Sequence, residues 1–409
     1  MESSRCPTNR NIFKTMKKQR VSLHVLHTES LYSRGGEKYL FELLKRLTST
    51  CTIHLYLHAI SPDWLRIYSD AGIRVTTLWR PARLFWPLLP LTLAINILEL
   101  RARVRSGDVV FATNFPMNFL AVLISKRAIC HCFEPLAIFY DPIRIRSLSP
   151  FSQYCVAVAK FLYAHFDKWA YRKTAILTAL GPTVAPHIIS IYGRNPDVYL
   201  PNGVDTNFFT PRKSQRAPMR KVFHIGHSTD YTIFKGTDDF LSILARFSSL
   251  RIPFHASISE SITDKVVKRK YMNFIRKHGL SRHVTFTGNI RERDFPDFYR
   301  SLDVFVYTGS PESAGGSTAS LSVLEAQACG TPVIRSGGDD REILSGKTGY
   351  YIDPHDHVAS ASTLAKFLRK ETSVRIRFQK NAQSYVKVHF NWEVTSRVLF
   401  GIVRRLKSL

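Results

Sequence analysis

Apolar runs and amphipathic stretches alternate along the first half of this chain. The segments 35–49 and 151–174 carry apolar residues at a helical spacing and predict helices. Short, nearly continuous apolar runs predict strands at 21–28, 52–60, 73–79, 108–114, 128–133 and 175–180. Buried strands that alternate with helices are typical of a parallel sheet that is covered on both faces.

A second alternating series follows the segment 198–218, whose Pro, Asn and basic residues predict a linker. In this series strands are predicted at 221–227, 254–259, 283–288, 303–309 and 331–337. We therefore expect an α/β protein in which two doubly wound, Rossmann-like domains face each other across a cleft. Ligands of such sheets bind at the carboxyl ends of the strands, so we expect the functional site in the cleft.

The longest apolar run, LFWPLLPLTLAINIL (84–98), is the segment to consider for contact with a membrane. It is shorter than the roughly 20 residues of a spanning helix, and it contains Pro87 and Pro90. It predicts either a buried helix that leads into the strand at 108–114 or an interfacial segment with arginine flanks. Both descriptions hold if one face packs and the other lies among lipid headgroups.

The charge narrows the classes of partner. The chain has 409 residues and a formal net charge of +27. Such a charge favours binding to anionic partners: nucleic acid, an acidic membrane surface or phosphate-bearing substrates. The interleaved basic and aromatic residues of a nucleic-acid module are missing from the sequence, so we expect no nucleic acid as a partner.

The cysteines and the first residues indicate the compartment. The six cysteines have neither the spacing of a zinc site nor that of a disulfide framework, so we expect reduced thiols in the cytoplasm. Residues 1–20 are polar and basic without an apolar core, and they predict a disordered tail that contacts anionic lipid rather than a secretory signal.

One acid stands out in the stretch GGSTASLSVLEAQACGTP (315–332). Glu325 shares a predicted helix face with Leu321, Leu324 and Ala328, where a carboxylate is costly unless it has a partner. It either pairs with a nearby Lys or Arg at the edge of the face, or it accepts two hydroxyls of a ligand such as a ribose diol. The small residues before the helix leave backbone N–H groups bare for a diphosphate. Together these features predict a nucleoside diphosphate site.

The segment LSVLEAQACGTPVI (321–334) closely resembles the signature of retaining glycosyltransferases of the group 1, or family 4, type. Five further segments resemble that family in the expected order: 34–47, 198–211, 224–241, 287–309 and 390–399. The resemblance implies the GT-B fold, with an N-terminal acceptor-side domain (21–200), a linker (201–218) and a C-terminal nucleotide-sugar-binding domain (219–388). It also implies that a C-terminal helix (389–409) crosses back to the N-terminal domain.

The resemblance also assigns roles by position. Glu325 would hold the ribose hydroxyls, Lys235 would bind phosphate, and His131, in the segment CHCFEP, would lie near the reacting sugar. The other implied donor-binding residues are the glycines that open the first helix and the residues around the helix that carries Glu325: Gly35, Gly36, Ser317, Thr318, Ser320, Leu321 and Ser322.

Two positions depart from the family pattern. Ser317 stands where the first acid of the family's paired motif is expected, and Glu312 is the nearest acid. The loop is therefore either longer than usual or has lost the carboxylate that contacts the transferred sugar. His227 stands where a phosphate-binding arginine is expected, so that charge is either weaker or comes from Arg291 or Arg293.

The resemblance implies a hexosyltransferase that needs no metal and no other cofactor. It would move a sugar, with retention, from a nucleoside diphosphate sugar to a saccharide or lipid-linked acceptor. The positive charge fits a peripheral position on the inner face of an anionic membrane. The alternatives are a nucleotide-sugar epimerase or a phosphorylase of the same fold, and a catalytically degenerate protein that only binds nucleotide sugars.

Overall fold

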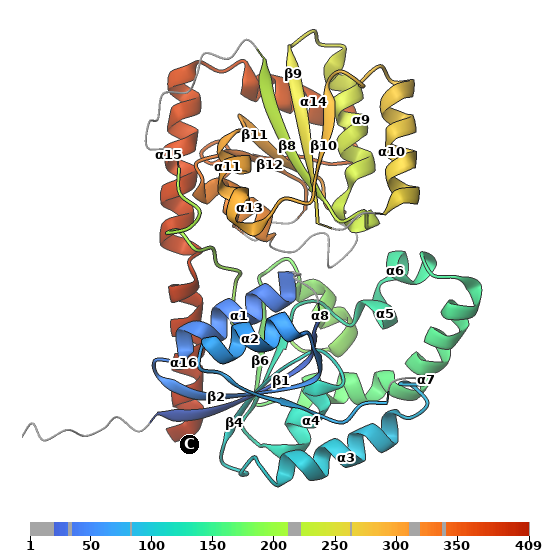
Figure 1. Cartoon of the computed structure of the whole chain (residues 1–409), viewed down its shortest axis with the longest axis vertical. Helices are drawn as coiled ribbons and strands as arrows, with labels where there is room; N and C mark the ends of the chain where they lie inside the picture. The colour runs from blue at the N-terminus through green and yellow to red at the C-terminus, as the bar shows by residue number, and fades with distance from the viewer. Residues whose placement is uncertain are drawn as a thin grey trace, which may run out of the picture.

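A computed structural model describes residues 20–31, 35–81, 84–211, 222–261, 264–310, 320–337 and 341–408. Two parallel sheets, each covered by helices on both faces, form two domains stacked along the long axis of the molecule (Figure 1). The predicted fold class, two doubly wound α/β domains, is confirmed. The tail at 1–19 and much of the predicted linker lie outside the described residues.

The N-terminal sheet has seven strands in the order β3-β2-β1-β4-β5-β6-β7, all parallel. Its strands are β1 (Val21–Ser30), β2 (Cys51–Ile60), β3 (Arg74–Thr77), β4 (Val109–Thr113), β5 (Ala128–Cys132), β6 (Ile176–Ala179) and β7 (Val198–Tyr199). Its helices are α1 (Gly35–Leu47), α2 (Pro62–Asp70), α3 (Leu89–Arg101), α4 (Met117–Ile124), α5 (Ala137–Tyr140), α6 (Pro142–Arg146), α7 (Pro150–Lys173) and α8 (Ala185–Tyr192).

The C-terminal sheet has six parallel strands in the order β10-β9-β8-β11-β12-β13. They are β8 (Phe223–Thr229), β9 (Phe254–Glu260), β10 (Val284–Gly288), β11 (Val304–Tyr307), β12 (Val333–Arg335) and β13 (Gly349–Tyr351). The helical elements are η1 (Ile233–Lys235), α9 (Thr237–Ser248), α10 (Lys265–Lys277), η2 (Glu292–Asp294), α11 (Phe295–Arg300), α13 (Leu321–Ala328), α14 (His357–Leu368) and α15 (Thr372–His389).

The central strands are buried along their length, which explains their continuous apolar sequences. All residues of β4, β5 and β11 are buried, as strands between two helix layers must be. In both sheets the strand order reverses beside the first strand of the domain, between β1 and β4 and between β8 and β11. These two reversal points are where doubly wound sheets bind ligands.

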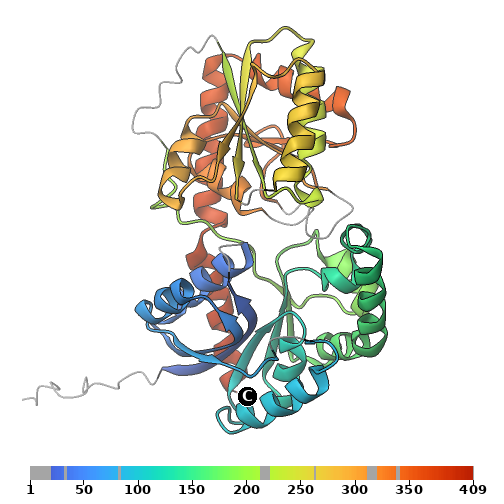
Figure 2. The same cartoon turned by 45° about the vertical axis from the view of Figure 1, so that its right-hand side comes forward.

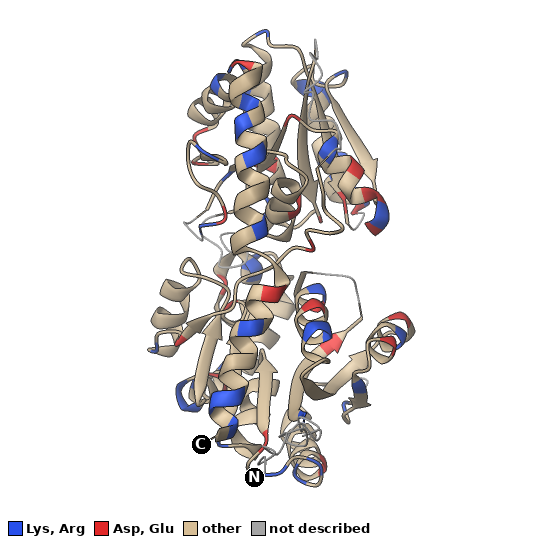
Figure 3. Ribbon diagram, turned by 90° about the vertical axis from the view of Figure 1, so that its left-hand side faces the viewer, with Lys and Arg blue, Asp and Glu red and all other residues tan. Residues whose placement is uncertain are grey.

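The last helix, α16 (Trp392–Ser408), lies on the N-terminal domain although α15 belongs to the C-terminal one (Figures 1 and 2). It packs on α1, and Trp392, Leu399 and Val403 are buried in the core of the N-terminal domain. The chain passes so close to Trp392 that a Cβ at Gly203 would lie 2.6 Å from the Trp392 nitrogen. Lys and Arg residues recur along α15 and α16 (Figure 3).

The apolar run 84–98 packs with one face only. Leu89, Leu93 and Asn96 are buried against the N-terminal core, whereas Leu91 and Leu98 are half or more exposed. Among the described residues no helix is both long and apolar enough to cross a membrane.

Candidate active site

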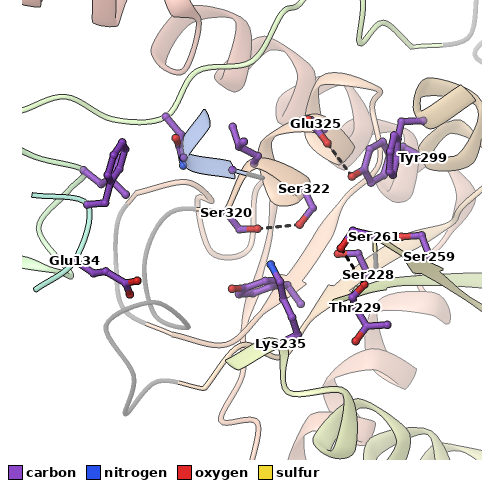
Figure 4. Close-up of a pocket in the computed structure, with 18 of the residues that line it drawn as sticks. Glu134, Ser228, Thr229, Lys235, Ser259, Ser261, Tyr299, Ser320, Ser322 and Glu325 are labelled. Carbon is purple, nitrogen blue, oxygen red and sulfur yellow. Dashed lines mark hydrogen bonds between the residues drawn. The ribbon is translucent and has the colours of Figure 1, made fainter. Parts of the chain in front are cut away.

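A cavity of about 490 Å³ lies between the two domains, at the carboxyl ends of both sheets. The N-terminal domain contributes Asn114, Glu134 and Leu180, which directly follow β4, β5 and β6 or come close behind them. The C-terminal domain contributes Lys235, Glu325 and a set of hydroxyl side chains (Figure 4). The cavity therefore lies where the predicted fold places a ligand.

Two helix N-termini meet at this cavity. Ser320 has extended backbone angles, φ −102° and ψ 127°, and is the N-cap residue directly before α13, while Gly35 begins α1. A Cβ at Gly35 would lie 3.9 Å from Leu321 Cδ1, so the two helix ends face each other. The first N–H groups of a helix have no partner within it and carry partial positive charge. The structure brings Gly35, Gly36, Ser320, Leu321 and Ser322 together in a seat suited to an anion.

Lys235 lies across the cavity from Glu134 (Figure 4). It ends the short turn η1, and Gly236 follows with a φ of 63°. A Cβ at Gly236 would lie 1.7 Å from the carbonyl oxygen of Thr308, so only glycine fits there. The close approach of this turn to the end of β11 fixes Lys235 in the cavity wall, with Nζ 6.0 Å from the centroid of the Tyr307 ring.

Glu325 lines the cavity, and the predicted pairing with a nearby lysine is present. Its Oε1 accepts a hydrogen bond from Lys38 Nζ at 2.9 Å, and its Oε2 accepts one from Tyr299 Oη at 2.9 Å. Lys38 comes from α1, so this ion pair joins the two domains. Lys38 Nζ also lies 3.4 Å from Glu292. Burial opposes the charge of Lys38, but these two carboxylates outweigh it and hold its pKa above the ordinary value.

Four hydroxyl side chains in the cavity wall were not predicted. Ser228 and Thr229 end β8, and Ser259 and Ser261 lie at the end of β9. All four are at the carboxyl ends of strands beside the reversal point of the C-terminal sheet. Small polar residues directly after an apolar strand are the signal that could have found them.

Glu134 is a further cavity residue whose role the sequence did not predict. It lines the cavity from the N-terminal domain, and its carboxyl group points into it (Figure 4). Burial and the nearby Asp141 raise its pKa to about 7, against the opposing effect of Arg144. Within the described part of the chain it has neither a hydrogen bond nor an ion pair, so its carboxyl group is available to a ligand.

His131 does not reach the cavity. It is fully buried in β5, its Nδ1 lies 3.0 Å from Thr178 Oγ1, and its ring stacks on Tyr39 at 5.1 Å between centroids. Burial lowers its pKa to about 3, so the ring is neutral. His131 therefore does not line the cavity, whereas Phe133 and Glu134, which follow it at the same strand end, do.

His227 also lies outside the cavity. One ring nitrogen contacts the Val306 carbonyl oxygen at 2.9 Å, the other contacts Thr237 Oγ1 at 3.1 Å, and the ring stacks on Phe240. Burial lowers its pKa to about 4. A neutral, fully hydrogen-bonded imidazole positions β8 and α9 and contributes no charge to a phosphate.

The remaining predicted residues are either not described or lie elsewhere in the described structure. Ser317, Thr318 and Glu312 lie outside the described residues. Arg291 is largely exposed and pairs with Asp294, and Arg293 lines a neighbouring cavity of about 370 Å³ on the other side of Glu325. Over the described ranges, no group of three or more His, Cys, Asp or Glu side chains could hold a metal ion.

Comparison with known proteins shows which family the C-terminal domain resembles. Residues 225–385 match the model of the family "Glycosyl transferases group 1". A D-inositol 3-phosphate glycosyltransferase from Paenarthrobacter aurescens is 30% identical over 245 residues, 57% of this chain and 58% of that protein. A GDP-mannose-dependent alpha-(1-6)-phosphatidylinositol monomannoside mannosyltransferase from Mycolicibacterium smegmatis is 28% identical over 212 residues, 48% of this chain and 51% of that protein. The matches thus span only about half to three fifths of these relatives.

The likeness of the fold extends over nearly the whole chain. The crystal structure of Anabaena HepE in complex with UDP and glucose superimposes with a TM-score of 0.68 at 18% identity, over 94% of this chain and 100% of that one. The segment 225–385 therefore resembles the group 1 glycosyl transferases in sequence, and the whole chain has the two-domain GT-B fold.

Proposed function

We propose that the protein is a retaining glycosyltransferase that uses a nucleoside diphosphate sugar as donor. One observation carries the proposal: Lys235, the N-terminus of α13 and Glu325 line the same cavity, at the reversal point of the C-terminal sheet. The helix N-terminus and Lys235 suit a diphosphate, and a carboxylate one turn into the helix suits the two ribose hydroxyls.

The positive groups of the cavity would assist departure of the diphosphate. When the bond between the anomeric carbon and the diphosphate oxygen breaks, negative charge grows on that oxygen. Lys235 and the N–H groups at the start of α13 are fixed in position before the reaction and stabilise this charge. These protein groups supply the charge in our proposal without a resident metal. Turnover in the presence of EDTA tests this part.

The N-terminal domain would bind the acceptor. In the proposed reaction an acceptor oxygen forms a bond to the anomeric carbon on the face from which the diphosphate leaves, which retains the configuration. The hydroxyl loses its proton in this step, and Glu134, with its carboxyl group in the cavity, is positioned to accept it. In this proposal the C-terminal wall of the cavity binds the donor and the N-terminal wall binds the acceptor.

Glu325→Gln tests the donor site. Glutamine keeps the shape and one acceptor oxygen but loses the charge, so we expect nucleotide binding to weaken about 10- to 100-fold. The measurement is a panel of UDP-, GDP-, ADP- and dTDP-sugars, scored by thermal shift and by nucleotide release. Glu393→Ala removes an acid of α16 that pairs with Arg46 of α1 outside the cavity, and it serves as the control.

The panel also separates the alternatives. A transferase releases nucleotide faster when a suitable acceptor is added, an epimerase yields a new nucleotide sugar without an acceptor, and a phosphorylase requires inorganic phosphate. A degenerate binding protein shows a thermal shift without turnover. Unchanged binding and turnover in a folded Glu325→Gln variant would contradict the assigned role of Glu325.

For the acceptor we propose a saccharide or a lipid-linked saccharide, used at the cytoplasmic face of a membrane. The relative from Mycolicibacterium smegmatis is named for a phosphatidylinositol monomannoside, which is a glycolipid. A net charge of +27 favours an anionic lipid surface as the place where such an acceptor is met.

A further inference from the structure

The outer face of α7 carries an exposed apolar stripe that the packing of the domain leaves uncovered. The helix spans Pro150–Lys173 and forms the edge of the N-terminal domain, at the right in Figure 2. Large apolar side chains at a helical spacing are exposed along it: Phe151 (77%), Tyr154 (68%), Val158 (41%), Phe161 (85%), Leu162 (45%) and Trp169 (37%). From Phe151 to Trp169 this stripe is about 27 Å long.

The opposite face of α7 is fully used by the fold, which fixes the direction of the stripe. Val156, Ala159 and Tyr163 are buried, and α7 packs on α4, α5 and α8. Asp167 is buried as well and accepts hydrogen bonds from Asn118 and Tyr192. The stripe therefore cannot turn inward without breaking these contacts. Contiguous apolar surface of this kind marks an interaction site.

The charge around the stripe indicates the chemistry of the partner. Asp167 is the only acidic residue between positions 142 and 196, and it is buried. The same stretch carries seven basic residues: Arg144, Arg146, Lys160, Lys168, Arg172, Lys173 and Arg194. An aromatic and aliphatic face on a stretch of chain so rich in basic residues matches an anionic lipid surface, in which rings enter the headgroup layer and cations meet phosphate.

The segment that precedes α3 adjoins α7 and carries exposed apolar residues of its own. Tyr163 of α7 donates a hydrogen bond to the Trp86 carbonyl oxygen at 2.8 Å, so the two segments adjoin. Leu84 and Leu88, on either side of Trp86, are exposed at 68% and 36%. The run 84–98, which the sequence marked as a candidate interfacial segment, is thus the neighbour of a larger apolar face on α7.

We propose that α7, together with the segment before α3, is the face through which this protein docks on an anionic membrane. Arg144, in the helix just before α7, stacks on Phe234 of the C-terminal domain at 5.8 Å, beside Lys235. The stripe therefore begins near the mouth of the catalytic cavity. Docking along it holds that mouth at the lipid surface. Docking itself does not depend on the proposed function; only the orientation of the cavity toward a lipid-linked acceptor rests on it.

Vesicle sedimentation of the full chain tests the proposal. We expect the protein to sediment with vesicles of phosphatidylglycerol and phosphatidylcholine at low salt and to stay in solution with phosphatidylcholine alone. The double variant Phe151→Ser/Phe161→Ser removes two side chains that contribute little to folding, and we expect its partition coefficient to fall about tenfold or more. The matched control is Val266→Ser/Val358→Ser, which changes equally exposed apolar residues of the C-terminal domain.

A second pair of variants tests the charge. We expect Arg146→Gln/Lys173→Gln, beside the stripe, to lower partitioning about fivefold for each charge removed. Arg377→Gln/Lys380→Gln removes two exposed charges from α15, on the opposite side of the molecule (Figures 1 and 3), and we expect the smaller change.

Three results would overturn the proposal. The first is that the parent protein ignores anionic vesicles, and the second is that the Phe double variant sediments like the parent. The third is that the parent is a dimer by light scattering and the double variant a monomer without vesicle binding, which would assign the stripe to a second copy of the chain. No nucleotide sugar is present in these experiments, so they can fail while glycosyl transfer stands, and the reverse.

Discussion

Glu325 shows how one carboxylate serves both the fold and the ligand. In the free protein Lys38 and Tyr299 occupy its two oxygens, so the acid is buried without being left unpaired. A ribose diol that donates to the same oxygens must share or displace Lys38. The ion pair therefore competes with the nucleotide and, at the same time, holds α1 of one domain against α13 of the other.

Lys38→Met tests this competition. The variant frees Oε1 of Glu325, and we expect nucleotide binding to tighten about threefold to tenfold because the ligand no longer displaces a cation. Lys38→Arg keeps the charge and serves as the control. Isothermal titration with UDP and GDP measures the change. Equal or weaker binding by Lys38→Met would show that Lys38 supports the nucleotide rather than competing with it.

Glu134 predicts how the reaction depends on pH. Its pKa is raised to about 7, so the carboxylate that accepts a proton is formed as the pH rises through 7. We therefore expect the rate of nucleotide release in the presence of acceptor to rise between about pH 6 and 8 and to level off above. Glu134→Gln should be slow at every pH and lose this rise. A profile that keeps the rise in Glu134→Gln would assign the titration to another group.

The sequence predicted residues well where their surroundings lie in the same segment. Glu325 stood out because its neighbours on the helix are apolar, and that pattern is local. His131 and His227 were misjudged because their burial depends on distant partners, Thr178 and Val306, which no local pattern reveals. Glu134 was missed for the converse reason: only the fold shows that its carboxyl group points into the cavity.

At the scale of elements, the fold followed from continuous apolar runs, because a strand between two helix layers must be apolar on both faces. The site, in contrast, depends on the turns that connect strands to helices, and apolar runs do not show where these turns lie. The turn between β8 and α9 is the clearest case. Its position depends on contact between Gly236 and the Thr308 carbonyl group at the end of β11, a contact between segments far apart in sequence.

Gly236→Ala tests this junction against a matched glycine. Both Gly236 and Gly279 have positive φ, 63° and 68°, but a Cβ at Gly279 would meet no atom within 4 Å. We expect Gly279→Ala to cost about 1 kcal/mol of strain, and Gly236→Ala about 2 kcal/mol more, because the backbone must move away from Thr308. Urea denaturation measures both. Donor binding should weaken in Gly236→Ala alone, since only this turn carries Lys235.

At the scale of the whole molecule, the chain ends by returning to the domain in which it began. α16 completes the core beside α1, and the edge of the Trp392 ring packs on Tyr39 at 5.5 Å between centroids. The N-terminal core is therefore incomplete until the last helix is in place. The sequence predicted this return only through the resemblance to a family, because an amphipathic helix does not specify which of two domains it covers.

Trp392→Ala tests whether the two domains depend on this helix unequally. Removing a fully buried Trp side chain leaves a cavity, and we expect a loss of about 3–5 kcal/mol that falls mainly on the N-terminal domain. Hydrogen exchange followed by mass spectrometry should show lost protection in α1 and β1, while β8 to β12 stay protected. Trp79→Ala, at a half-exposed site, should change little and controls for the loss of an indole ring. Equal loss of protection in both domains would mean instead that the two domains unfold as one unit, because the consecutive helices α15 and α16 couple them.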